Sequence, residues 1–182
     1  ALGGGSAMDL AKVVLAYLST GETDIIDLLT YKGNYEKSIP SIFLPTTHGT
    51  GSEVTMWGTI WNMSEKKKYS ISHMDLYPDI AILDGNLTLS LPIDISIITT
   101  LDALSHSFEA IWNKNANEKS TEYAIDAITT ILSNVELFKQ NLIDINVRNK
   151  LLKASTKAGL AFSNTKTAAA HSISYPLTSR FG

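Results

Sequence analysis

The sequence predicts an incomplete α/β nucleotide-binding portion followed by an all-helical metal-binding portion. In the first half, a glycine run leads into a helical pattern, and a short apolar run leads into a loop rich in glycine and hydroxyl groups. After Pro92 the apolar residues recur at helical spacing and strand signals become few. We therefore place the boundary near Leu91, with residues 1–91 in the α/β portion and 92–182 in the helical portion.

The composition is that of a globular protein, and it limits both the classes of partner and the ligand atoms that the chain can offer. The chain has 182 residues, 44% of them hydrophobic, and a net charge of −3 from 15 basic and 18 acidic side chains. Such a weak field does not favour nucleic acid or an acidic membrane as a partner. Without cysteine, the ligands must be oxygen and nitrogen atoms. Because the apolar runs are too short to span a bilayer and no export signal is seen, we expect a cytoplasmic protein.

Each element of the α/β portion has its own signal. The segment Ala1–Ser6 has the character of a strand end and its loop, so we expect the chain to be a piece of a longer protein. Helical spacing of apolar residues predicts a helix over Asp9–Leu18, and proline-bounded Ile39–Leu44 predicts a buried strand. Further strands are expected over Lys66–Ser72 and Ile80–Leu83, the second ending at the turn signal Asp84-Gly85-Asn86.

The helical portion is predicted from apolar periodicity alone. The expected helices are Leu101–Ile111, Thr121–Phe138, Ile145–Phe162 and Ala168–Ile173. The chain then closes on a glycine without a polar tail, which also indicates a piece of a longer chain.

The glycine run Gly3-Gly4-Gly5-Ser6 is a candidate phosphate site. Bare glycine backbone lets a pyrophosphate approach, and the free N–H groups of the following helix attract its charge. Ser6 adds a hydroxyl donor or caps the helix. The alternative is an ordinary turn, since the run lacks the Gly-x-Gly-x-x-Gly spacing of a dinucleotide fingerprint.

The segment Pro45–Thr55 is a second candidate, with two glycines and four threonines at the end of the predicted strand. Ligands of open α/β sheets bind at the carboxyl ends of strands, which favours a ligand loop. The alternative is a solvated loop whose hydroxyls cap the next helix.

Asp102 and His106 are candidate metal ligands. They are four residues apart in a helical segment, so both side chains project from one face. A carboxylate and an imidazole suit Fe²⁺, Zn²⁺, Mn²⁺ or Ni²⁺ better than Ca²⁺. The alternative is a hydrogen bond on the helix surface. His171, on a further helical segment, has the alternative of a core or interface histidine.

Taken together and in order, these segments resemble the iron-containing (group III) alcohol dehydrogenases over nearly the whole chain. The glycine run with Asp9 and Lys12 is similar to the family's pyrophosphate motif, and Pro45–Thr55 matches its Pro-Thr-Thr-x-Gly-Thr-Gly-Ser-Glu-Val-Thr loop. Segments that resemble the metal helix and the next ligand stretch are Asp102–His106 with Glu109 and Gly159–Asn164 leading to His171. Lys68 falls where members place a lysine near the nicotinamide ribose.

The resemblance implies a metal-dependent oxidoreductase that transfers hydride between NAD or NADP and a small alcohol or aldehyde. It implies a dehydroquinate-synthase-like architecture, a homodimer, and Fe²⁺ or Zn²⁺ as the metal. The implied nucleotide-binding residues are Gly4, Gly5, Ser6, Asp9, Thr46, Thr47, Thr50, Ser52, Thr55 and Lys68. The implied metal ligands are Asp102, His106 and His171, with the family's last histidine expected beyond Gly182.

Two rival functions and one substrate hypothesis accompany this interpretation. A dehydroquinate-synthase-like lyase is disfavoured, because its metal helix is expected to offer other ligands than Asp102 and His106. The other rival is a non-catalytic truncated fragment. Lys66-Lys67-Lys68 followed by Tyr69-Ser70 is similar to members that reduce phosphonoacetaldehyde, and the alternative is a solvated basic strand end. We interpret His48 and His73 as surface residues without a role.

Overall fold

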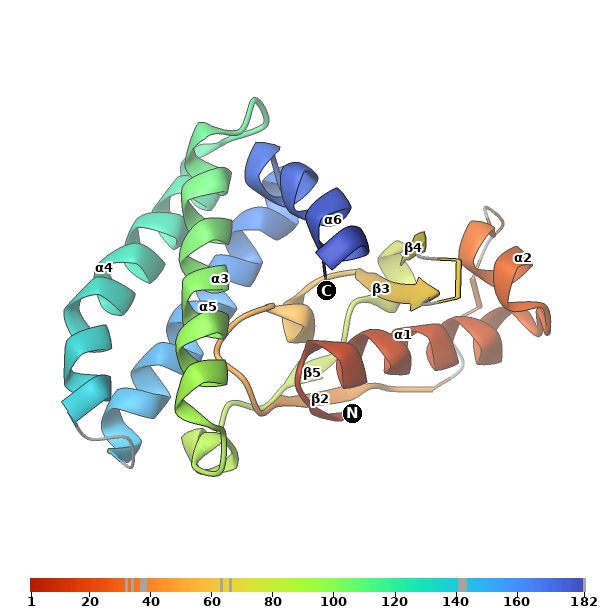
Figure 1. Cartoon of the computed structure of the whole chain (residues 1–182). Helices are drawn as coiled ribbons and strands as arrows, with labels where there is room; N and C mark the ends of the chain where they lie inside the picture. The colour runs from red at the N-terminus through yellow and green to blue at the C-terminus, as the bar shows by residue number, and fades with distance from the viewer. Residues whose placement is uncertain are drawn as a thin grey trace.

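The computed structural model describes residues 1–31, 33, 35–36, 39–62, 64–65, 67–140 and 144–181. Figure 1 shows a group of long helices standing beside an α/β part, with the C-terminal helix lying over the region between them. Among the described residues, no helix has the length and apolarity that crossing a membrane takes.

A three-stranded parallel sheet forms the base of the α/β part. Its order is β1 (Leu2–Gly3), β2 (Ile42–Pro45) and β5 (Ile80–Ala81). β1 and β2 are paired so that Gly3 faces Pro45. Since the two strands are parallel and end side by side, the loops that follow them begin at the same edge of the sheet.

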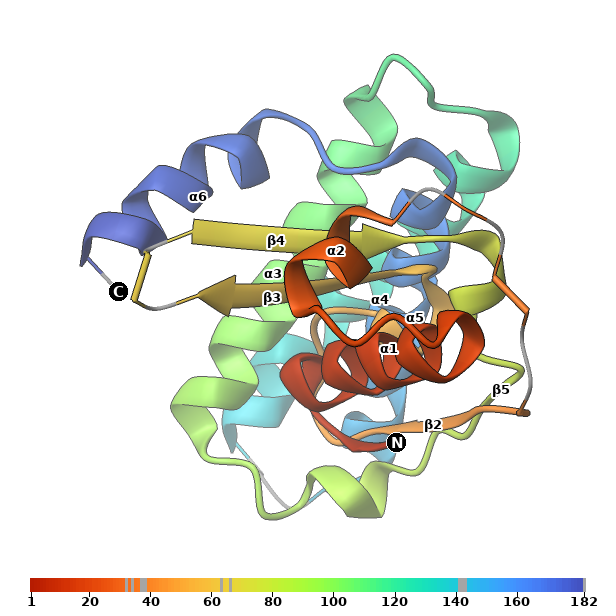
Figure 2. The ribbon, with the colours of Figure 1, turned by 90° about the vertical axis from the view of Figure 1, so that its right-hand side faces the viewer.

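Helix α1 (Gly5–Thr20) follows β1 and packs along the sheet, and α2 (Ile25–Thr30) follows it. The hairpin β3 (Trp57–Asn62) and β4 (Lys67–Ser72) lies across α1 and extends toward the C-terminal helix, as Figure 2 shows. One apolar core joins these elements, and its members include Met8 and Val13 of α1, Phe43 of β2 and Ile71 of β4.

Four helices form the second part. They are α3 (Ile93–Trp112), α4 (Glu118–Gln140), α5 (Ile145–Thr165) and α6 (Ala169–Phe181). The first three pack against one another through small residues, among them Ala103, Ala127, Ala154 and Ala158, so the helix backbones lie close together. Three short 3₁₀ helices complete the fold: η1 (Ser52–Val54), η2 (Met74–Leu76) and η3 (Gly85–Thr88).

The expected elements are present, with changed bounds. The helix predicted over Asp9–Leu18 is longer at both ends, and the short helix predicted from Ala168 continues through Pro176 to Phe181. β2 begins at Ile42 and not at Ile39, because the Ser41 N–H and hydroxyl are bonded to the Asp79 carboxylate. β5 covers only Ile80–Ala81. Lys66, the expected first residue of β4, lies outside the described residues.

Apart from the 3₁₀ helices, two elements were not expected from the sequence. α2 is only six residues long and is fixed by Asp24, whose carboxylate accepts the N–H groups of Ile26 and Asp27. β3 was missed although it contains two tryptophans and a β-branched pair, which are frequent in strands. This second omission matters, because β3 forms a wall of the candidate site.

Candidate active site

The two glycine- and threonine-rich loops meet at the edge of the parallel sheet. A Cβ built on Gly4 would lie 3.1 Å from Thr47 Cγ2, and one built on Gly5 would lie 2.5 Å from Thr50 Cγ2. Glycine is therefore required for the loops to pack this closely. Gly4 caps α1 with backbone alone, and the first turn of that helix carries no acidic side chain. This helix N-terminus has the free N–H groups and the unopposed dipole that suit an anion.

A buried lysine ties the second loop to α1. Lys12 is fully buried, and its Nζ donates hydrogen bonds to Ser52 Oγ (2.8 Å), Thr55 Oγ1 (3.1 Å) and the Trp57 carbonyl (2.8 Å). Asp9 accepts from Ser52 Oγ (2.7 Å) and from the backbone N–H of Thr59 (2.9 Å). Burial lowers the pKa of Lys12 to about 8, although Asp9 and Glu53 act in the opposite direction. The network holds the loop against both α1 and β3.

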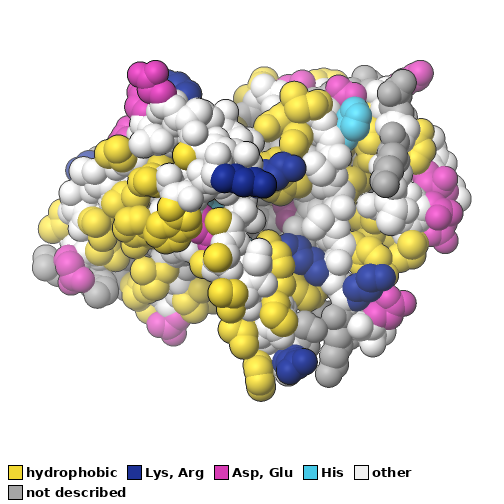
Figure 3. Space-filling model, turned by 90° about the horizontal axis from the view of Figure 1, so that it is seen from above, with side chains coloured by type: hydrophobic (Ala, Val, Ile, Leu, Met, Phe, Trp, Pro, Cys, Tyr) yellow, Lys and Arg dark blue, Asp and Glu magenta, His cyan; other side chains and the backbone are white. Residues whose placement is uncertain are grey.

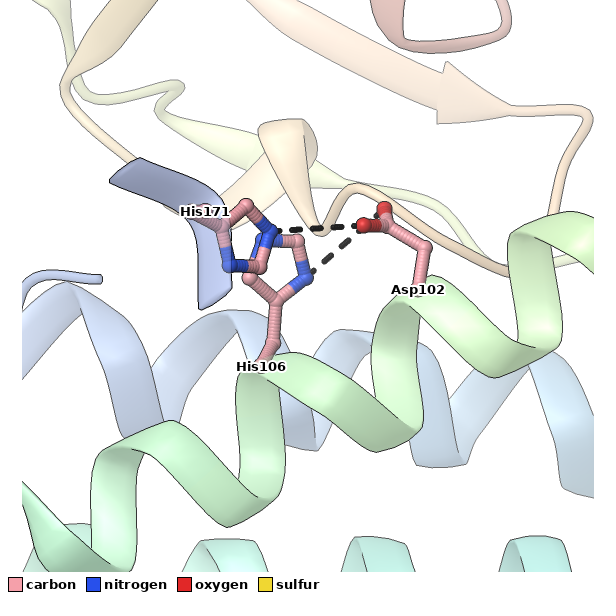
Figure 4. Close-up of side chains that lie close together, drawn as sticks. All are labelled: Asp102, His106 and His171. Carbon is pink, nitrogen blue, oxygen red and sulfur yellow. Dashed lines mark ion pairs between the residues drawn. The ribbon is translucent and has the colours of Figure 1, made fainter. Parts of the chain in front are cut away.

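Asp102, His106 and His171 come together from two helices. Asp102 and His106 project from one face of α3, and His171 reaches them from α6 (Figure 4). The distances are 3.7 Å from His106 Nδ1 to Asp102 Oδ2 and 3.4 Å from His171 Nε2 to Asp102 Oδ1. One ligand atom from each residue lies within 4.8 Å of the others. The two imidazole rings are stacked, with centroids 4.3 Å apart.

This donor set fits a divalent transition metal. One carboxylate and two imidazoles are ligands that Fe²⁺ and Zn²⁺ accept. His106 Nδ1 is buried and has no hydrogen-bond partner among the described residues, which is costly for a polar atom unless a ligand satisfies it. We call these three residues the Asp102–His106–His171 cluster.

Glu109 orients the third member of the cluster. Its side chain is fully buried on α3, and Oε1 lies 2.8 Å from His171 Nδ1 and accepts the His171 backbone N–H at 3.0 Å. The backbone N–H of Ala168 donates to the other oxygen. A carboxylate on one ring nitrogen of a histidine fixes the tautomer and directs the other nitrogen toward a metal. Here that other nitrogen, Nε2, faces Asp102.

The electrostatics of the cluster follow from burial and from these pairs. Burial lowers the pKa of His106 to about 4, against the opposing effect of Asp102. For His171 burial acts in the same direction, but hydrogen bonds to Asp102 and Glu109 outweigh it and raise the pKa. Burial would raise the pKa of Asp102, yet its bonds and charges from the two histidines lower it. His106 is thus neutral and Asp102 ionised near pH 7, the forms that coordinate a metal, whereas the raised pKa of His171 favours a proton that a bound metal would replace.

One cleft of ≈ 550 Å³ joins the cluster to the α/β part. Of the predicted nucleotide-binding residues, five line it: Asp9, Thr50, Ser52, Thr55 and Lys68. The whole cluster lines it as well, together with β3 and α6. Figure 3, seen from above, shows a hollow near the middle of the face with basic side chains gathered around it. The other five lie outside the cleft: Gly4, Gly5, Ser6, Thr46 and Thr47 belong to the loop starts at the adjacent sheet edge.

Comparison with known proteins identifies the family. The family model "Iron-containing alcohol dehydrogenase" matches residues 1–85, and the model of the C-terminal part of the same family matches residues 96–182. The chain belongs to the iron-containing alcohol dehydrogenase family.

Individual known proteins are similar to this chain along its whole length. Long-chain-alcohol dehydrogenase 1 of Geobacillus thermodenitrificans is 38% identical over 99% of this chain and 46% of its own length. Phosphonoacetaldehyde reductase of Streptomyces viridochromogenes is 29% identical over 100% of this chain and 48% of its own length. The crystal structure of sulfoacetaldehyde reductase from Bifidobacterium kashiwanohense in complex with NAD⁺ superposes with a TM-score of 0.92 at 36% identity, covering 100% of this chain and 48% of that one. The chain spans about half the length of these relatives.

Sequence reasoning misjudged His48. This residue is fully buried within the threonine loop and is not a surface residue. Burial, aided by the charge of Arg148, lowers its pKa to about 4. His73 is half-buried, stacks on Tyr35 and accepts the Asp75 N–H at the start of η2. His73 therefore has a local structural role.

The basic run on β4 divides into parts with different surroundings. Lys67 is exposed and lies over the Tyr69 ring at 4.8 Å, as a solvated strand end would. Lys68 instead lines the cleft. Among the cleft residues that sequence reasoning did not single out are Trp57, Trp61, Lys166 and Tyr175. The aromatic content of Trp57–Trp61 could have indicated β3, but no local pattern marks Lys166.

Proposed function

We propose that this chain supplies the catalytic cleft of a metal-dependent alcohol dehydrogenase or aldehyde reductase that uses a nicotinamide nucleotide. The observation that carries the proposal is that the Asp102–His106–His171 cluster, Thr50 and Lys68 line the same cleft. A metal site alone, or a phosphate-binding loop alone, is compatible with many protein functions. Their convergence on one cleft, in a member of this family, supports hydride transfer at a polarised carbonyl.

The cluster would hold the metal. A bound divalent metal supplies Lewis acidity that polarises a carbonyl or favours ionisation of an alcohol. Asp102 brings the negative charge, and neutral His106 brings a lone pair that burial keeps free of a proton. Glu109 holds the His171 ring with Nε2 directed at the same point. We propose Fe²⁺ first, by family membership, and Zn²⁺ as the alternative that the same ligands accept.

The nucleotide would lie along the sheet edge and enter the cleft with its nicotinamide end. Gly4, Gly5 and Ser6, at the N-terminus of α1, suit a pyrophosphate. Thr46, Thr47 and Thr50 follow the neighbouring strand and offer hydroxyls at the same edge. Lys68 lines the cleft, where a ribose hydroxyl of the nucleotide would approach it. The nicotinamide supplies or accepts the hydride. We propose NAD, in line with the nucleotide bound to the similar reductase, and NADP as the alternative.

Three of the predicted nucleotide-binding residues already form hydrogen bonds within the protein. Asp9, Ser52 and Thr55 line the cleft, but Lys12 or the β3 backbone already engages their oxygens. We infer that they act on a nucleotide mainly by fixing the loop that carries Thr50. The substrate class, a small aldehyde or alcohol, is supported by relatives named as reductases of phosphonoacetaldehyde and sulfoacetaldehyde.

Replacing His106 with Ala tests the proposal in the complete protein. Metal content, measured by elemental analysis, is expected to fall at least tenfold and turnover of NADH with aldehydes to be lost. NADH binding, measured by fluorescence titration, is expected to change less than threefold, because the loops belong to the other part of the fold. The matched control is His73→Ala, a histidine outside the cluster, which should retain metal. Full metal and turnover in His106→Ala would refute the proposed function.

A further inference from the structure

The cleft contains a lysine in a backbone conformation that lysine rarely adopts. Lys166, directly after α5, has φ 68° and ψ 173°, and it is the one non-glycine residue with positive φ in the part of the chain that the structure describes. This region of backbone space is nearly restricted to glycine, and residues held there cluster at ligand-binding positions. The surroundings must therefore impose this conformation on Lys166.

Lys166 belongs to the linker between α5 and α6, residues 166–168. Hydrogen bonds on both sides hold this linker in place. Before it, Asn115 Nδ2 donates to the Thr165 carbonyl at 3.3 Å, and Asn113 Nδ2 donates to the Lys166 carbonyl at 3.2 Å. After it, the Ala168 N–H donates to Glu109, the residue that orients His171. The linker backbone is thus fixed to the same carboxylate as the metal cluster. Lys166 itself lines the cleft, is exposed, and forms no ion pair with any described carboxylate.

A second ammonium group lies on the hairpin side of the cleft. Lys68 of β4 sits over the ring of Tyr175 of α6, with Nζ 3.4 Å from the ring centroid. This cation–π contact keeps the positive charge, because an aromatic ring does not neutralise it. The ring also connects the hairpin to the helix that carries His171.

The negative groups of the cleft are already engaged. Its two acidic residues are Asp9 and Asp102. Asp9 accepts hydrogen bonds from Ser52 and from the Thr59 backbone, and Asp102 is paired with both histidines of the cluster. The charges left without an acidic partner among the described residues are the two ammonium groups. The ammonium groups of Lys68 and Lys166 are therefore the positive charges of this cleft with which an anionic substrate would pair.

We propose that Lys166 is a specificity-determining residue and that it selects small aldehydes that carry an anionic group. The carbonyl end is directed to the cluster, and the anionic end pairs with the Lys166 ammonium. Sulfonate, phosphonate and carboxylate share this chemistry. The inference rests on the proposed function for the reaction, but the anion site follows from the charges of the cleft alone.

The backbone conformation of Lys166 allows a substitution that removes the charge without straining the linker. Lys166→Gly removes the ammonium and places in the linker the residue that its backbone conformation favours, so the protein should fold at least as well. Lys166→Arg keeps the charge. The assay uses the complete protein and compares kcat/KM for sulfoacetaldehyde, phosphonoacetaldehyde and a short carboxylate aldehyde with kcat/KM for propanal. We expect a preference of at least tenfold for one or more of the anionic aldehydes, which Lys166→Gly reduces at least tenfold and Lys166→Arg largely retains.

A binding measurement separates this inference from the proposed function. Trp57 and Trp61 line the cleft, so their fluorescence can report binding of 2-hydroxyethanesulfonate without turnover. We expect this anion to bind at least tenfold more weakly to Lys166→Gly, while metal content is unchanged. Reduction of propanal as efficient as that of every anionic aldehyde would overturn the inference and leave the proposed function standing. Lys166-dependent anion binding in a protein that reduces no aldehyde would support the anion site and overturn the proposed function. Equal anion binding by both proteins would also overturn the inference.

Discussion

Gly51 and Gly159 pack backbone against backbone, at the point where the threonine loop meets helix α5. A Cβ built on Gly159 would lie 2.8 Å from the Gly51 Cα, and one built on Gly51 would lie 2.5 Å from the Gly159 Cα. Gly51 also has a left-handed φ of 59°, which glycine adopts without strain. The nucleotide loop and the helical part are therefore joined by a contact that no side chain could replace.

Gly159→Ala is expected to destabilise the protein in spite of its higher helix propensity. Alanine in a helix is favoured over glycine by about 1 kcal/mol. Overpacking against a backbone that cannot move aside typically costs about 1–3 kcal/mol, so we expect a net loss of up to about 2 kcal/mol in the free energy of unfolding. Urea denaturation measures this change in the free energy of unfolding. Lys153→Ala, on the exposed face of the same helix, is the control and should change by less than about 0.5 kcal/mol. A more stable Gly159→Ala protein would show that the contact is loose.

Lys12 should make stability rise with pH. Its pKa is about 8 in the folded protein and 10.5 in the reference state, so the unfolded chain binds more protons between these values. Stability must then increase as the pH rises through this window, and the Lys12 contribution amounts to about 1–2 kcal/mol between pH 7 and 9.5. Lys12→Met removes this dependence. Since other groups titrate in both proteins, the difference between their two pH profiles isolates Lys12.

Measuring the free energy of unfolding at pH 7, 8, 9 and 9.5 gives both profiles. We expect Lys12→Met to be the less stable protein at every pH, because Ser52, Thr55 and the Trp57 carbonyl lose their common donor. The gap should widen toward pH 9.5. Parallel profiles would mean that the Lys12 ammonium is not affected by burial.

Ser6→Asp distinguishes a phosphate site from an ordinary helix start. Ser6 is exposed in the first turn of α1, where an added carboxylate interacts favourably with the helix dipole, by about 0.3–1 kcal/mol. The same charge repels a pyrophosphate. We therefore expect the melting temperature to stay or rise while NADH affinity falls at least tenfold, about 1.4 kcal/mol. Ser6→Asn has nearly the same shape without the charge and should bind NADH within about threefold. Unchanged affinity in Ser6→Asp would place the phosphates elsewhere.

Ser6→Asp tests the phosphate site more directly than a bulky residue at Gly5 would. Because a Cβ on Gly5 would already lie 2.5 Å from Thr50, valine there would disturb the loop whether or not a nucleotide binds. Loss of binding in Gly5→Val would then have two explanations.

How far the sequence predicts the site depends on whether the signal is local. The Asp102–His106 pair follows from the helical repeat, and the strand before the threonine loop follows from an apolar run between prolines, so both were predicted. His171 is 65 positions beyond His106, and no spacing brings the two together. The resemblance to a family supplied that contact, and the structure contains it.

Features that depend on packing were not predictable from local pattern. His48 lies among hydroxyls and glycines, which suit a solvated loop, yet it is fully buried, and the charge of Arg148 on α5 acts on it. Glu109 belongs to the segment that resembles the family's metal helix, but its contact with His171 is visible only once α6 and the residue before it place three N–H groups around it. Lys166 carries no motif, because its positive φ depends on hydrogen bonds from Asn113 and Asn115, which directly follow α3. The domain boundary near Leu91 and the homodimer stay predictions.

Glu109→Gln is expected to weaken metal binding without touching a ligand. All three groups that bond to Glu109 are donors: His171 Nδ1, the His171 N–H and the Ala168 N–H. A carboxylate accepts from all three, whereas an amide has one oxygen and turns its NH₂ group toward at least one donor. The His171 ring then loses its fixed orientation, and loss of such an outer carboxylate typically lowers metal affinity 10–100-fold. Competition with a chelator measures this affinity. Glu118→Gln, at an exposed site on α4, is the control and should bind metal normally. NADH affinity should stay within about threefold in both variants, because Glu109 lies outside the cleft. Equal metal affinity of Glu109→Gln and the unsubstituted protein would mean that Asp102 and His106 bind the metal without an oriented His171.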